Sequence, residues 1–235
     1  MAKNIYVGVN NVAKKPKNIY VGVNGVARKV KAAYVGVNGV ARKVWPNSIL
    51  PLDYQQVEYI LNSNSTQYID TEIKPSSSTR VETSFKLRNV TLNRIFYCHW
   101  NYTEYGFYIS SNNPHLFYVG FNNTDGGTNI APTANTVYTV NFNMSNGIFK
   151  INGQIVKTFT NTFSNLSRNL YIFPEESNKL EFDLYYFKVW DNVTLVRDMY
   201  PCYRISDRVP GLFDIVNNTF YTNKGTGIFY TGPDI

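Results

Sequence analysis

Cysteine and histidine are scarce in this chain, with two of each among 235 residues. Two cysteines allow one disulfide at most. Cys98 and Cys202 each stand beside aromatic residues, which favours buried thiols over a bridge. His99 and His115 have no cysteine or aspartate at the spacing of metal ligands. The sequence therefore predicts neither a disulfide framework nor a histidine-based metal centre.

Long apolar runs are missing as well. No segment approaches the roughly 20 apolar residues of a membrane-spanning helix. The start of the chain, MAKNIYVGVNNVAKK, has an apolar run of five residues, too short for the core of a signal peptide. A Gly-x-Ser-x-Gly motif and a phosphate-binding glycine loop with its lysine are also lacking. We expect no membrane insertion and no cofactor.

Acidic residues are absent from the first 52 positions, which hold nine of the 23 Lys and Arg residues, whereas all 16 acidic residues follow. The net charge of +7 therefore belongs to a basic N-terminal segment on a nearly neutral remainder. Such a segment can contact nucleic acid or an acidic protein surface. Its cations alternate with strand-forming residues rather than cluster, so we expect a solvated face or a protein contact and no nucleic acid.

The same segment repeats one phrase three times at a spacing of 14 residues: IYVGVNNVAKKP, IYVGVNGVARKV and AYVGVNGVARKV. Asn-Gly between β-prone residues is a strong signal for a two-residue hairpin turn. Residues 1–46 are therefore predicted to form three hairpins, with Val21 opposite Arg28 and Val23 opposite Val26 on a mainly aliphatic face. The alternative is a flexible leader that happens to be duplicated.

A lone two-stranded ribbon is marginal in water, so these hairpins are predicted to dock on other chains or on copies of themselves, with a homotrimer as the expected assembly. The residues predicted to line the buried side are Ile5, Val7, Val9, Ile19, Val21, Val23, Val35 and Val37.

Helical periodicity is lacking from residues 47–235, where short segments rich in β-branched and aromatic residues recur about every ten positions. This texture predicts an all-β, two-sheet β-sandwich that ends in a tail of short strands. The strands are expected at 67–73, 79–87, 94–100, 105–110, 116–121, 137–143, 147–153, 154–159, 169–173, 180–190 and 194–204.

Two stretches of this region resemble a known fold family. VYTVNFNMSNGIFKINGQIVKTF is similar to the hairpin of laminin-G and concanavalin A-like jelly rolls, and NLYIFPEES with LEFDLYYFKVWDN is similar to the strands that follow. The likeness covers roughly residues 53–204. It implies a concanavalin A/laminin-G-like sandwich, within which function depends on the site rather than the fold.

A second resemblance covers the two ends of the chain. The YVGVNGVARKV repeats, LPLDYQQVEYILNSNSTQYIDTEIKP and the tail from PCYRISDRVPGLFDIVNN onward are similar to minor structural proteins of phages and prophages of gut bacteria. This likeness implies a virion appendage, fibre or decoration protein assembled in the bacterial cytoplasm. The implied partners are other virion proteins and a host-surface or mucosal glycan, and appendages of this kind are commonly trimeric.

A catalytic pair is suggested by LEFDLYY. Concanavalin-fold glycoside hydrolases carry Glu-x-Asp-x-Glu or Glu-x-Asp-x-x-Glu on one strand, where one Glu attacks and another protonates the leaving oxygen. Glu181 and Asp183 would share a face of a strand, but the next position on that face is Tyr185. With no second Glu, we expect no enzyme activity. A free carbohydrate-binding module and a glycoside hydrolase remain the alternative functions.

Glycan binding is expected at two loops, because sugars bind flat aromatic faces together with planar amides and carboxylates. For Trp100 a place in the core is an equal alternative. A calcium site on Asp125 competes with an Asp-Gly turn, and the turn explains the same letters without a metal. The predicted glycan-binding residues are Trp100, Asn101, Tyr102, Glu104, Tyr105, Asn122, Asn123 and Asp125.

Overall fold

A computed structural model gives the arrangement of most of the chain, and no helix occurs in the part that it describes. That part consequently contains no helix long and apolar enough to cross a membrane. The chain divides into two compact units, Met1–Asp53 and Tyr54–Ile235, whereas the sequence placed the boundary after residue 46. The described residues are 7–9, 12–14, 19–30, 33–37, 40–45, 49–62, 66–91, 93–98, 101–109, 115–122, 124–173 and 180–235.

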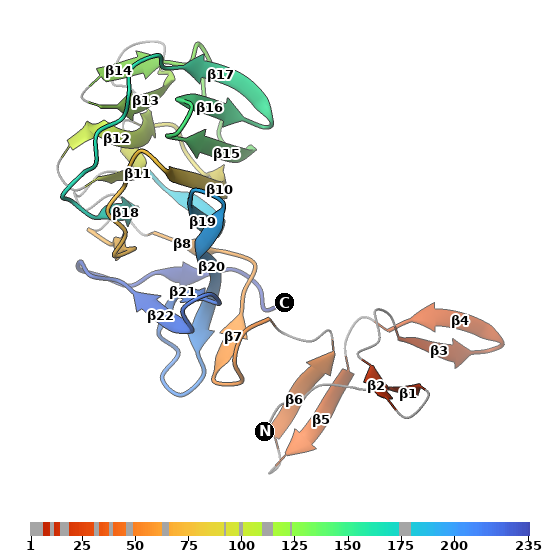
Figure 1. The fold of residues 1–235 in the computed structure, drawn as a ribbon. Coiled ribbons are helices and arrows are strands. Elements are labelled where there is room, and N and C mark those ends of the chain that lie inside the picture. Colours follow the sequence, from red (N-terminus) through yellow and green to blue (C-terminus); the bar gives the residue numbers. More distant parts are fainter. Residues whose placement is uncertain are drawn as a thin grey trace. The chain divides into compact units, whose positions relative to one another are not determined.

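Two antiparallel sheets form the second unit (Figure 1). Within the described residues the small sheet has six strands, in the order β14 (Thr124–Gly127), β13 (Phe117–Phe121), β12 (Asn101–Ile109), β11 (Asn93–Cys98), β18 (Leu170–Ile172) and β9 (Ile69–Asp70). The large sheet has eight strands along its path, in the order β17 (Gln154–Thr158), β16 (Ile148–Ile151), β15 (Val137–Asn143), β10 (Thr79–Leu87), β19 (Phe182–Asp191), β20 (Thr194–Arg204), β21 (Pro210–Asp214) and β22 (Thr219–Thr222).

Three further short strands join the large sheet beside this path. The strand β7 (Tyr54–Gln56) pairs with β20, while β8 (Ile60–Leu61) pairs with both β19 and β23 (Tyr230–Thr231). The C-terminal residues therefore lie against the first residues of the same unit, and an isolated bridge between Val57 and Asp234 continues this contact. Both ends of the unit belong to the sheet rather than to separate tails.

The core between the sheets is mainly aromatic. Phe85 of β10, Phe107 of β12 and Phe142 of β15 are each fully buried, and their rings contact further aromatic rings at centroid distances of 4.9–6.3 Å. Tilted and edge-on pairs of this kind contribute about 0.5–1.5 kcal/mol each beyond the burial of apolar area. The high aromatic content thus stabilises the packing of the two sheets against each other.

Buried charges fix the C-terminal strands to the sandwich. Asp214 of β21 has no exposed surface, and its Oδ1 accepts hydrogen bonds from the backbone N–H groups of Asp198 (2.8 Å) and Val216 (3.1 Å). Its Oδ2 lies 3.7 Å from the Nε of Arg197, and that Nε donates to the carbonyl oxygen of Thr71 at 3.0 Å. Since Thr71 directly follows β9, this arginine connects the two sheets.

Three hairpins make up the described part of the first unit: β1 (Val7–Val9) with β2 (Val12–Lys14), β3 (Tyr20–Val23) with β4 (Val26–Lys29), and β5 (Ala33–Val37) with β6 (Val40–Trp45). In the middle hairpin Val21 pairs with Arg28 and Val23 with Val26, which is the predicted register. Its turn residues Asn24 and Gly25 have φ values of 51° and 76°, as a type I′ turn requires.

The predicted fold class, an all-β two-sheet sandwich preceded by short hairpins, is confirmed. The strands at 79–87, 137–143 and 194–204 have the predicted bounds, and the other predicted strands differ at one or both ends by one to four residues. The strands β21 and β22 were not predicted as separate strands. The segment after residue 204 is rich in Gly, Asn and Asp, which hid two four- and five-residue strands within turn-like sequence.

A fragment that begins at Asn47 should fold without the hairpins. All of the aromatic core and both ends of the large sheet lie within Tyr54–Ile235. We expect a single cooperative thermal transition, monitored by near-ultraviolet circular dichroism, with a midpoint close to that of the full chain. A fragment that binds a hydrophobic dye and melts without cooperativity would contradict the independence of this unit.

Candidate functional site

The outer face of the large sheet, opposite the core, gathers polar and aromatic side chains in rows that cross its strands. In one row Arg80 of β10 pairs with Asn143 of β15 and with Trp190 of β19. In the next row Glu82 of β10 pairs with Asn141 of β15 and with Lys188 of β19. The rows arise because alternate residues of each strand face away from the core.

Glu82 is the carboxylate at the centre of this face. Its Oε2 accepts a hydrogen bond from Asn141 Nδ2 at 3.0 Å, and its Oε1 accepts one from the Tyr186 hydroxyl at 3.3 Å. Burial of Tyr186 and the neighbouring charge of Glu82 raise the pKa of this tyrosine to about 12. The hydroxyl therefore stays protonated at neutral pH and remains a donor to the carboxylate.

Two cations stand beside aromatic rings on the same face. The guanidinium carbon of Arg80 lies 3.8 Å from the centroid of the Trp190 ring. At this distance the guanidinium is attracted to the electron-rich face of the indole. Lys188 Nζ lies 3.1 Å from Asp198 Oδ1 and 5.4 Å from the Tyr200 ring centroid. Burial lowers the pKa of Lys188, but hydrogen bonds to Tyr200 and Asp198 outweigh it, so the pKa is raised.

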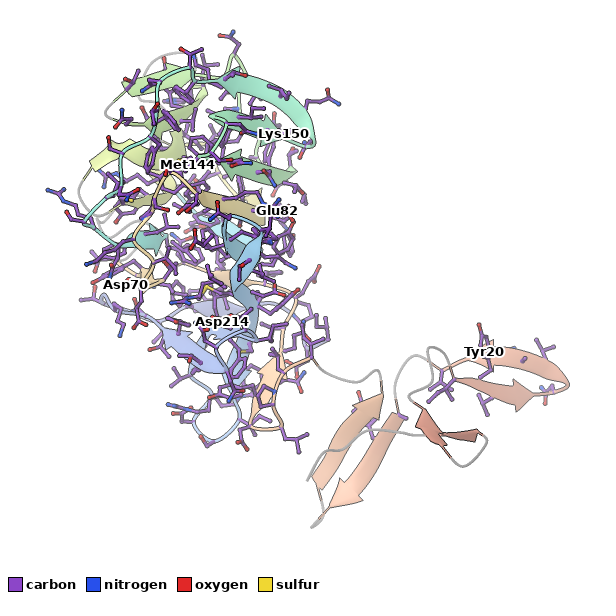
Figure 2. The ribbon with its side chains drawn as sticks, in the orientation of Figure 1. Tyr20, Asp70, Glu82, Met144, Lys150 and Asp214 are labelled. Carbon is purple, nitrogen blue, oxygen red and sulfur yellow. The ribbon has the colours of Figure 1, made fainter. Side chains whose placement is uncertain are left out.

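A groove of about 400 Å³ opens on this face over β10, β15 and β16. Figure 2 shows two of its residues, Glu82 and Lys150, on the side of the domain away from the small sheet. We call it the outer-face groove. It is lined by Arg80, Glu82, Thr139, Asn141, Asn143, Asn146, Ile148, Lys150 and Gly153.

Several donors in the outer-face groove are available to a ligand. The Oδ1 atoms of Asn143 and Asn146 accept backbone hydrogen bonds within the turn that joins β15 to β16, at 3.0 and 3.1 Å. Among the described residues the Nδ2 atoms of these two asparagines have no partner. Amide donors, a fixed carboxylate and nearby aromatic rings are the groups that bind sugar hydroxyls and pyranose faces.

The loop residues predicted to bind glycan are only partly described. Trp100 and Asn123 lie outside the described residues. Asn101, Tyr102 and Glu104 lie on β12 and Asp125 on β14, but nothing is described of their side chains. Asn122 is half-buried, and its Nδ2 donates to the carbonyl oxygen of Thr162 at 3.1 Å, a contact within the protein.

Tyr105 does not belong to a glycan-binding surface, contrary to the prediction. The side chain has no exposed area, and its ring stacks on Phe142 at a centroid distance of 5.2 Å. The sequence predicted a loop between strands at 94–100 and 105–110, but β12 begins at Asn101 and continues to Ile109. On a strand, Tyr105 and Phe107 point to the same face, and that face is the core.

The prediction of an Asp-Gly turn at Asp125 was also wrong. Residues 124–127 form β14, in which Asp125 pairs with Gly120 of β13. The reversal occurs one step earlier, where Asn122 adopts a φ of 51°. Asparagine tolerates this left-handed conformation better than most residues, so the turn forms there and the Asp-Gly pair continues the strand.

The pair considered for catalysis has a structural role at Asp183. This carboxylate is fully buried and is held by Lys86 Nζ at 2.8 Å and Arg88 Nε at 2.6 Å. Glu181 precedes β19 rather than lying on it. A carboxylate bound by two cations and closed to solvent is not placed to attack a substrate, and it instead fastens β19 to β10.

The two cysteines are buried and form no disulfide, as predicted. Burial raises the pKa of the Cys202 thiol to about 12, which keeps it unreactive near neutral pH. Within the described residues no group of three or more His, Cys, Asp or Glu side chains is arranged to hold a metal ion.

Sequence analysis did not find the outer-face groove, although a signal was present. In TRVETSF, VYTVNFN and YYFKVW the buried apolar residues alternate with polar ones, as the burial of the corresponding strands shows. A search for facing polar positions on neighbouring strands would have gathered Arg80, Glu82 and Asn141. The search for sugar-binding residues was limited to loops, where function is more common.

No family model and no curated protein matches the chain. Among solved structures, the native heptameric SAP-like pentraxin from Limulus polyphemus is similar, with a TM-score of 0.46 and 12% sequence identity over 74% of this chain and 96% of that one. At this TM-score and identity, the similarity gives no information about the ligand or the assembly of this chain.

Replacing Tyr105 with Phe should raise the stability of the fold. Within the described residues the Tyr105 hydroxyl is buried without a hydrogen-bond partner, and an unpaired buried hydroxyl costs about 1–3 kcal/mol. We expect the free energy of unfolding in urea to rise by about 1 kcal/mol. A loss of stability would show that the hydroxyl has a partner.

Proposed function

We propose that the protein is a structural component of a phage particle, an appendage, fibre or decoration protein of the virion. In this proposal the β-sandwich binds a host-surface or mucosal glycan in the outer-face groove, and the N-terminal hairpins attach the protein to other virion proteins. The proposed particle is supported by the resemblance of the repeats and of both flanking segments to phage structural proteins.

The glycan-binding part rests on the outer-face groove. Its donors and acceptors are fixed by strands: Glu82 is oriented by Asn141 and Tyr186, and Arg80 is stacked on Trp190. Groups that are already positioned lose little conformational entropy when a ligand binds. A groove lined almost entirely by polar and charged side chains suits an oligosaccharide better than it suits an apolar small molecule.

The attachment part rests on the surface of the hairpins. In the middle hairpin Val21, Val23 and Val26 expose 51%, 38% and 58% of their surface. One register places Val23 and Val26 opposite each other and Val21 opposite Arg28. An isolated ribbon with an exposed aliphatic face gains stability from association. We propose that this face docks on virion proteins or on copies of itself, with a homotrimer as the expected assembly.

A binding role without catalysis is the proposal for the sandwich. Asp183, the sole aspartate of the LEFDLYY motif, is bound by Lys86 and Arg88. Glu82, the carboxylate of the outer-face groove, stands between an amide and a tyrosine, whereas glycoside hydrolysis ordinarily uses two carboxyl groups about 5–5.5 or 6.5–9.5 Å apart. The groove therefore offers one carboxylate for recognition.

Replacing Asn141 with Ala should weaken glycan binding about tenfold or more, because it removes an amide of the groove and releases Glu82 from its fixed position. The measurement is binding of the full-length protein to a glycan array, followed by calorimetry with the best oligosaccharide. Asn161→Ala is the matched control, since Asn161 is exposed in the loop after β17. Equal binding by both variants would exclude the groove as the glycan site.

Replacing Val21 with Asp should abolish attachment while the hairpin stays folded. The new carboxylate would stand opposite Arg28, a favourable cross-strand pair, but it would interrupt the aliphatic face. We expect a folded sandwich, a lower mass in sedimentation analysis and no incorporation into particles. Ala27→Asp puts the same charge on the opposite face and should assemble normally; the reverse outcome would assign docking to that other face.

A further inference from the structure

Positive charge exceeds negative charge among the residues that line the outer-face groove. Arg80 and Lys150 both line the groove, and among the described residues the side chain of neither forms an ion pair or a hydrogen bond. The Nε of Arg80 is moreover buried without a hydrogen-bond partner. A buried donor without a partner carries an energetic cost. The two terminal nitrogens of the Arg80 guanidinium are not buried in this way, and they are the donors that a ligand can reach.

Glu82 forms no ion pair with either cation, and its single negative charge leaves the groove with a net positive charge. Its two oxygens accept hydrogen bonds from Asn141 and Tyr186, which come from the strands on either side. Lys188, the remaining cation of this row, is paired with Asp198. The groove thus contains two unpaired positive charges against one carboxylate whose hydrogen bonds are already made.

We infer that the ligand of the outer-face groove is an acidic glycan, whose anionic group binds between Arg80 and Lys150. This inference rests on the proposed glycan-binding function and specifies its ligand. The planar guanidinium donates two parallel hydrogen bonds to a carboxylate, sulfate or phosphate oxygen pair. The more mobile ammonium of Lys150 acts as a point charge, and Asn143 and Asn146 donate to neighbouring sugar hydroxyls.

Glu82 should affect the binding of acidic and neutral ligands in opposite directions. Glu82 lies on the same face of β10 as Arg80. The negative charge of Glu82 therefore repels an anionic ligand but not a neutral one. Replacing Glu82 with Gln keeps the size of the side chain and removes that repulsion. Acidic glycan should therefore bind about threefold more tightly to Glu82→Gln, whereas a neutral sugar would lose an acceptor and bind more weakly.

The test measures binding of the full-length protein to three polysaccharides: polygalacturonate, which carries carboxylates, dextran sulfate, which carries sulfates, and neutral dextran. We expect one or both acidic polymers to bind and dextran not to bind. Which acidic polymer binds distinguishes the source of the anion. The double variant Arg80→Gln with Lys150→Gln should lose at least tenfold in affinity for the acidic polymer.

The matched control is Arg168→Gln with Lys224→Gln, which removes the same two charges from exposed positions outside the groove. It should bind as the unaltered protein does, with both double variants melting at similar temperatures. Equal losses in the two double variants, or weaker binding by Glu82→Gln, would overturn the inference. Binding of dextran that Asn141→Ala abolishes would overturn it but retain the proposed function. Binding of no polysaccharide would count against both.

Discussion

The pairing of β10 with β15 on one side and β19 on the other is the constraint on which the remaining structure depends. Because side chains alternate between the faces of a strand, the register that buries Val81 and Phe85 also places Arg80 and Glu82 on the outside. A slip of one residue would exchange these sets and bury two charges. Core packing and the outer-face groove are therefore fixed by the same hydrogen bonds.

The acidic residues of the large sheet are mostly occupied in holding it together. Asp183 joins β19 to β10 through Lys86 and Arg88, and Asp214 orders the chain around β20 and β21. Removing one partner from a buried ion pair of this kind is strongly destabilising, because it leaves the other charge buried without compensation. Their use as structural links explains how a nearly neutral domain can have a groove in which cations are in excess.

The sequence predicted the sandwich and the hairpin register because both depend on local patterns. Asn24-Gly25 specifies its own turn, and VYTVNFN alternates as a half-buried strand must. The candidate site was harder to predict because it is assembled from strands distant in sequence: Arg80 and Trp190 become neighbours only through the pairing of β10 with β19. Tyr105 was misassigned for a related reason, since its burial depends on packing against Phe142 of the other sheet, which residues near it in sequence do not show.

The most direct test of the central claim is hydrogen exchange of the full-length protein with and without an oligosaccharide selected from a glycan array. Slower exchange confined to β10, β15 and β16, the strands of the outer-face groove, together with a shift of the Trp190 indole signal, is the predicted result. Slower exchange at the ends of β11, β12 and β13, with the large sheet unaffected, would contradict the account and return the site to the loops.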